Sequence, residues 1–113
     1  MKTLQELSEQ EHGAVTEFRQ KVAEAFPGTS ARYTLFGSRA RGDAEAESDL
    51  DLLLELEIDR LSFADKETLH WLASEVSMQY GLILSVLMVD RATARARGDF
   101  SIFVTIKEEG IPL

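Results

Sequence analysis

The sequence of 113 residues contains no cysteine, which excludes disulfide bonds and thiolate metal sites. Basic side chains are scarce: 12 Lys and Arg stand against 20 Asp and Glu, giving a formal net charge of −8. Because affinity for nucleic acid comes largely from Lys and Arg on phosphates, a long DNA or RNA partner is disfavoured. No apolar run approaches the length of a membrane span, and the first residues lack the apolar core of a signal peptide. We therefore expect a cytoplasmic protein without a membrane partner.

The rest of the composition is that of an ordinary globular protein. Hydrophobic residues make up 44% of the chain and charged residues 28%, a balance that allows one buried core. The length is typical of one domain, and no internal repeat, low-complexity tract or linker divides it. We therefore predict a single domain over residues 1–113.

The spacing of apolar residues predicts two clear helices. One is expected over residues 4–26, with Gly13 as a candidate break, and the other over residues 62–79. Ser62 with Asp65 resembles a capping pair, and Gly81 stands where a helix C-cap glycine belongs. On the second helix, Met78 is expected to fill core space and Trp71 to lie in the core or to face a partner.

Three strands are expected, over residues 31–36, 50–56 and 82–89. The last of these is a continuous apolar run, which is typical of a central buried strand. Residues 100–109 fit both the helical and the strand period, so periodicity alone leaves that segment open. The order of the elements indicates an α+β domain with a small mixed β-sheet and helices packed mainly on one face.

The most informative segment joins a glycine-serine turn to two aspartates. Gly37-Ser38 is followed by ten residues, 39 to 48, and then by Asp49-Leu50-Asp51. Strand residues alternate between faces, so the two carboxylates are expected to point the same way. Carboxylates this close repel each other unless a cation lies between them. Mg²⁺ is the usual cation, because it takes carboxylate oxygens and leaves sites for water and substrate phosphates. The pattern suits phosphoryl or nucleotidyl transfer.

The residue types around the turn suit a phosphate. Gly37 lets the backbone approach a phosphate closely, and Ser38 offers a hydroxyl and a backbone N–H. The guanidinium groups of Arg39 and Arg41 can each meet a phosphate with two hydrogen bonds; the alternative is a solvated pair that contacts neighbouring acids. Ser48 stands where its hydroxyl can orient the first aspartate, or it simply ends the loop.

The segment from Thr34 to Leu54 carries a family resemblance. It combines an apolar strand, the turn Gly-Ser-Arg-Ala-Arg-Gly, a gap of fixed length and a second apolar strand that begins with Asp-Leu-Asp. This combination resembles the nucleotidyltransferase superfamily related to DNA polymerase beta, and more closely its minimal nucleotidyltransferases. The resemblance favours a helix over residues 100–109, with Gly110 as its stop.

The resemblance implies a role for each motif residue. Gly37 and Ser38 would hold the β- and γ-phosphates of a nucleoside triphosphate, most simply ATP. Asp49 and Asp51 would bind one or two Mg²⁺ ions and form the catalytic pair.

One departure from the family pattern concerns the third carboxylate, which active members carry on the strand after the second helix. In this chain Ser85 occupies that place. The nearest acid is Asp90, five residues further along, where it could instead cap a short helix. Whether the chain is an active enzyme is therefore left open by the sequence.

The function expected from the resemblance is transfer of AMP from ATP to a hydroxyl of a partner protein or small molecule. Minimal nucleotidyltransferases are often paired with a small helical protein of the higher-eukaryote-and-prokaryote nucleotide-binding (HEPN) type in toxin–antitoxin pairs. The resemblance thus implies an acceptor presented by such a partner. One alternative is a catalytically degenerate module that binds nucleotide or partner without chemistry; another is an assembly module that binds no nucleotide. Homo-oligomer formation is left open.

Overall fold

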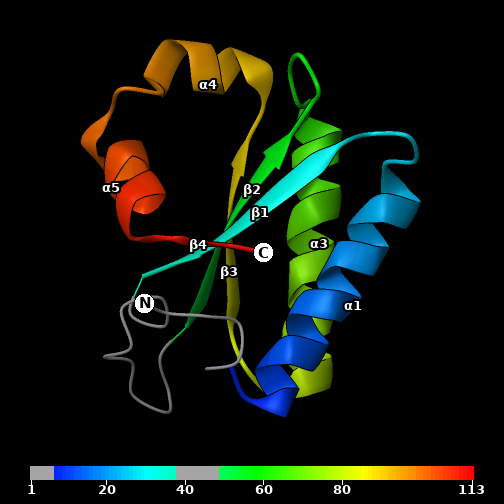
Figure 1. Ribbon diagram of the computed structural model, residues 1–113. Helices are drawn as coiled ribbons and strands as arrows, with labels where there is room; N and C mark the ends of the chain where they lie inside the picture. Colours follow the sequence, from blue (N-terminus) through cyan, green and yellow to red (C-terminus); the bar gives the residue numbers. More distant parts are fainter. Residues whose placement is uncertain (1–6, 38–48) are drawn as a thin grey trace.

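The computed structural model describes residues 7–37 and 49–113, and confirms an α+β fold (Figure 1). Helices and strands follow one another much as the periodicity predicts, and within residues 100–109 a helix, Ser101–Glu109, ends before Gly110. In chain order the elements are α1 (Glu9–Ala25), β1 (Ala31–Phe36), β2 (Leu50–Leu56), α3 (Phe63–Tyr80), β3 (Leu84–Val89), α4 (Arg91–Arg97), α5 (Ser101–Glu109) and β4 (Ile111–Pro112).

The four strands form one mixed sheet in the order β3-β2-β1-β4. β1 is antiparallel to both of its neighbours, whereas β2 and β3 run parallel, joined by the crossover through α3. The prediction of a central strand over residues 82–89 is therefore wrong, because β3 lies at an edge of the described sheet. Its apolar run has another cause. Residues on one face of this strand belong to the core with α3, and residues on the other face cluster with Ile106 of α5.

The main core lies between the sheet and the pair of helices α1 and α3. Every second residue of β2 from Leu50 onward is buried on this side, where Phe18 of α1 and Leu69 of α3 are fully buried. Figure 1 shows the two helices side by side along one face of the sheet. Burial of this apolar surface is the main force that keeps the sheet packed against the helices.

The opposite face of the sheet is only partly covered. Leu53 of β2 and Val89 of β3 form a small second cluster with Ile106 of α5. The helices thus pack mainly on one face, as predicted, and α5 shields a limited patch of the other (Figure 1). At the end of β1 this patch reaches Phe36, which packs against the same cluster, whereas Asp51 and Ser85 are not among the residues of the cluster.

Capping residues set the ends of the two long helices. Ser62 and Asp65 form a reciprocal capping box at the start of α3, and Gly81 ends that helix in a left-handed conformation, both as predicted. In α1 an equivalent box between Ser8 and Glu11 fixes the start at Glu9, later than residue 4. The helix continues through Gly13 without a break.

Candidate functional site

A row of three register partners crosses the sheet near the C-terminal end of β1 and the N-terminal ends of β2 and β3. Phe36 of β1 pairs with Asp51 of β2, and Asp51 pairs in turn with Ser85 of β3. Their neighbours Leu35, Leu52 and Leu84 are buried in the core with α1 and α3. Because strand residues alternate between faces, the row points to the α5 side.

The bend after β1 lies directly against the second aspartate. Gly37 has a φ of 76°, a left-handed conformation that glycine adopts without steric cost. A Cβ at this position would lie 3.2 Å from Cγ of Asp51 and closer still to its carboxylate oxygen Oδ2. The space that a side chain would fill at residue 37 is therefore occupied by the Asp51 carboxylate. The predicted proximity of the turn and this carboxylate is present in the fold.

Asp49 lies just before β2 and is exposed. The backbone N–H of Leu50 donates to the carbonyl of Ile83, so the pairing with the β3 side extends to this point. Leu50 itself is buried on the α1 and α3 side. Alternation about Leu50 is expected to put Asp49 on the same face as Asp51, but Asp49 precedes β2, so the shared face stays a prediction.

Four of the predicted site residues fall in the connection between these strands. Ser38, Arg39, Arg41 and Ser48 lie outside the described residues, so their assignment to phosphates and to Asp49 stays a prediction.

Ser85 stands at the position where a third carboxylate is expected. It is exposed and is the direct partner of Asp51 in the parallel pairing of β2 and β3. Its hydroxyl can donate or accept a hydrogen bond, but it is a much weaker ligand for a hard cation than a carboxylate.

Asp90 has a structural role at the far end of the same strand. Its carboxylate accepts hydrogen bonds from the backbone N–H of Leu61 at 2.8 Å and from that of Thr93 at 2.7 Å, and it forms the N-cap of α4. Burial alone would raise the pKa of Asp90, but these backbone donors and the Lys66 charge outweigh it and lower the pKa to about 2. Asp90 is thus committed to the fold and is no substitute for the missing acid.

The chemistry of the carboxylate pair would suit a divalent cation. Asp49 and Asp51 could offer oxygen ligands, and Gly37 adds no side chain beside the Asp51 carboxylate. Mg²⁺ is commonly held by one or two carboxylates together with substrate phosphates and water. Over residues 7–37 and 49–113, no group of three or more His, Cys, Asp or Glu side chains could hold a metal by itself.

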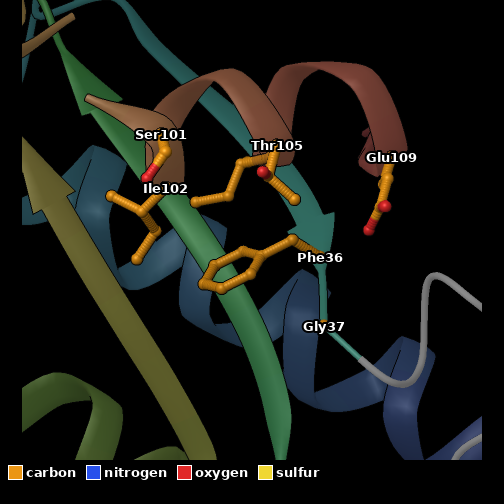
Figure 2. A pocket seen from close by; sticks show the side chains of 7 residues that line it. Phe36, Gly37, Ser101, Ile102, Thr105 and Glu109 are labelled. Atoms are coloured by element: carbon orange, nitrogen blue, oxygen red, sulfur yellow. The ribbon is translucent and has the colours of Figure 1, made fainter. Parts of the chain in front are cut away.

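A cleft of about 350 Å³ opens beside the same bend, and sequence reasoning missed it (Figure 2). Phe36 and Gly37 form one wall and α5 forms the other. Ser101, Thr105 and Glu109 recur every fourth residue along that helix, which puts them on one face. This spacing would have been a signal once the segment was known to be helical. The lining residues are Phe36, Gly37, Ser101, Ile102, Thr105, Ile106 and Glu109.

Comparison with protein families gives one clear match: a family model described as a nucleotidyltransferase domain covers residues 15–108. The matched stretch takes in α1 from Val15 onward, the whole sheet apart from β4, and nearly all of α5. Comparison with curated proteins and with solved structures gives no significant match in either set. Within the part of the chain that the structure describes, no helix has the length and apolar content needed to cross a bilayer.

Proposed function

Because the chain belongs to the nucleotidyltransferase domain family, and its general role is therefore nucleotidyl transfer, we propose that it transfers AMP from ATP to a hydroxyl acceptor. Gly37 and Ser38 hold the β- and γ-phosphates, and Arg39 and Arg41 contact the triphosphate. Asp49 and Asp51 are the catalytic pair that holds Mg²⁺, with Ser48 orienting the first of them.

The observation that carries this proposal is the contact between Gly37 and Asp51. A bend that binds phosphates and a carboxylate that binds a metal must be adjacent if both are to serve one nucleotide. Register brings them together, since Phe36 pairs with Asp51 and Gly37 is the next residue. The glycine also puts no side chain of its own against the Asp51 carboxylate.

In the proposed reaction the acceptor oxygen bonds to the α-phosphorus, the bond from the α-phosphorus to the bridging oxygen breaks, and pyrophosphate leaves. When bound, Mg²⁺ supplies charge that stabilises the phosphate oxygens and the leaving group. The protein contributes mainly position: the bend fixes the phosphate tail and the two aspartates fix the α-phosphate end. The hydroxyl proton passes to water, because Ser85 is not a base at neutral pH. Slow turnover follows from that last step.

The proposed acceptor is a hydroxyl presented by a second protein. The resemblance to minimal nucleotidyltransferases points to a HEPN-type helical partner and to the antitoxin side of a toxin–antitoxin pair. The exposure of Asp49 and Ser85 supports such an arrangement, because an acceptor on a second protein could approach from their side.

A second candidate function is favoured by Ser85. Its position beside Asp51 puts a hydroxyl where a third metal ligand and proton acceptor would be expected. The chain would then bind magnesium–ATP and act as a sensor or as a steric inhibitor of its partner, without transfer.

Incubation with ATP labelled on the α-phosphate, Mg²⁺ and the protein encoded next to it separates the two functions. Label on the partner that disappears in Asp51→Asn supports transfer, whereas binding of ATP without labelling supports the module. Glu55→Gln is the matched control, since Glu55 lies on the same strand and face but pairs with Arg32, at 3.5 Å. Calorimetry that detects neither ATP nor Mg²⁺ binding would refute both functions.

A further inference from the structure

The cleft beside the Gly37 bend has a chemistry different from that of a phosphate site. Its walls are the Phe36 ring and the Ile102 and Ile106 side chains, with the hydroxyls of Ser101 and Thr105 and one carboxylate, from Glu109. In Figure 2 the Phe36 ring lies beneath α5, toward Ile102 and Thr105, and the Glu109 side chain hangs on the side of the bend. An aromatic ring, aliphatic groups and a few polar atoms make up a typical pocket for a flat organic group.

Charge decides which part of a nucleotide such a cleft can take. Among the residues of 7–37 and 49–113 that line it, Glu109 is the only charged one. A carboxylate repels phosphate, so the triphosphate is disfavoured there. It accepts hydrogen bonds only, so it favours a neutral ring that carries N–H donors. Glu109 also sits in the last turn of α5, where the helix dipole disfavours a negative side chain, so the helix itself gains nothing from it.

The cleft adjoins the row of register partners formed by Phe36, Asp51 and Ser85. Phe36 lines the cleft and is the register partner of Asp51, and Gly37 lines the cleft and contacts the Asp51 carboxylate. A ligand in the cleft would therefore lie next to the bend and close to Asp51, the aspartate proposed to bind the metal. Its volume of about 350 Å³ lies within the range of small-molecule sites.

We propose that this cleft binds the nucleoside of the substrate, with the base against the Phe36 ring and its exocyclic amino group donating a hydrogen bond to Glu109. The inference rests on the proposed function, and it adds the substrate class: a nucleotide whose base carries an amino group. Specificity arises because a base without that group loses its one charge-assisted hydrogen bond to Glu109, which is exposed and would bind water instead.

Three ligands test this assignment by calorimetry in the presence of Mg²⁺: ATP, purine riboside triphosphate, which lacks only the 6-amino group, and inorganic tripolyphosphate. The wild-type chain should bind ATP roughly tenfold more tightly than purine riboside triphosphate, as expected for one charge-assisted hydrogen bond. Glu109→Ala should remove that preference. Glu108→Ala is the matched control, because it removes the same charge from the neighbouring position, which does not line the cleft.

A second variant blocks the cleft instead of changing its charge. Thr105 is exposed on α5, so Thr105→Trp fills the space without disturbing the core. It should weaken ATP binding at least tenfold and leave tripolyphosphate binding unchanged.

Several outcomes would overturn the proposal. Equal affinity of the wild type for ATP and tripolyphosphate would remove the nucleoside site while leaving the phosphate site and the proposed function intact. A preference for ATP over purine riboside triphosphate that survives in Glu109→Ala, or disappears equally in Glu108→Ala, would show that Glu109 does not read the base. Unchanged ATP binding in Thr105→Trp would show that the cleft is not used. Failure of the wild type to bind any of the three ligands would refute the proposed function along with it.

Discussion

Asp51 and Ser85 are register partners on the parallel strands β2 and β3. The pairing puts a hydroxyl immediately beside the carboxylate that contacts the Gly37 bend, at the sheet position where a third acid would complete the metal site. The resemblance predicts a third carboxylate at residue 85, and the register puts that residue beside Asp51. What differs is a single side chain, and that difference can be reversed.

Restoring the acid should strengthen the metal site. In Ser85→Asp a third carboxylate joins Asp49 and Asp51, so without metal the added repulsion should lower the midpoint of thermal unfolding. With millimolar Mg²⁺ the midpoint should rise by more than in the wild type, because ion binding stabilises the folded state. Thermal unfolding with and without Mg²⁺ measures both effects, and labelling of an acceptor should increase.

The control for this substitution is Ser74→Asp, which adds the same charge at an exposed position of α3. A response to Mg²⁺ no greater in Ser85→Asp than in Ser74→Asp would contradict the placement of the metal between β2 and β3.

Much of this fold could be predicted from the sequence because its signals are local. Strands over residues 31–36 and 50–56 have the bounds predicted, since the first ends directly before Gly37 and the second begins directly after Asp49. The capping box at Ser62 needs only four consecutive residues, and it is present as expected. Where the structure reports on the Gly-Ser and Asp-x-Asp motif, the turn and the second aspartate lie together.

The errors concern properties that depend on distant parts of the chain. A strand covered on both faces reads as an apolar run whether it is central or at an edge, so the position of β3 could not be read from its residues. Met78 is 80% exposed, which contradicts its expected place in the core, since it lies off the stripe that buries Leu69 and Val76. The cleft needs the docking of α5 on β1, which no local pattern encodes.

The division of α3 into a buried and an exposed face predicts opposite outcomes at nearby residues. Leu69→Ala should lower the free energy of unfolding by about 2–5 kcal/mol, because Leu69 is fully buried and leaves a cavity. Trp71→Ala should change it by less than about 1 kcal/mol, because the Trp71 side chain is 65% exposed. Urea denaturation of the two variants checks the difference, and a loss at Trp71 equal to that at Leu69 would contradict the packing.

The depressed pKa of Asp90 predicts a loss of stability in acid. Its pKa falls from an ordinary 3.8 to about 2 in the folded protein, so the ionised carboxylate stabilises the fold fully above pH 4. That contribution should disappear as the pH drops from 4 toward 2. Asp90→Ala removes the N-cap of α4 and the acceptor for the Leu61 N–H, and should cost about 1–3 kcal/mol at pH 7.

Asp90→Asn is the informative comparison, because asparagine caps a helix about as well as aspartate but does not titrate. The stability difference between the wild type and this variant, measured by urea denaturation, should shrink as the pH is lowered from 5 to 2. A difference that stays constant over that range would show that the Asp90 carboxylate is not held ionised by its backbone donors.

The contact between Gly37 and Asp51 can be separated from backbone strain, because the chain contains a matched glycine. Gly37 and Gly28 have nearly the same φ, 76° and 79°, so alanine should cost each about 1–2 kcal/mol of stability. A Cβ at Gly28 would meet nothing within 4 Å, whereas one at Gly37 would collide with the Asp51 carboxylate. Gly37→Ala should therefore lose magnesium–ATP binding at least tenfold, and Gly28→Ala should retain it. Calorimetric titration of both variants decides the point: equal affinities would mean that the Asp51 carboxylate need not lie against the bend for the nucleotide to bind.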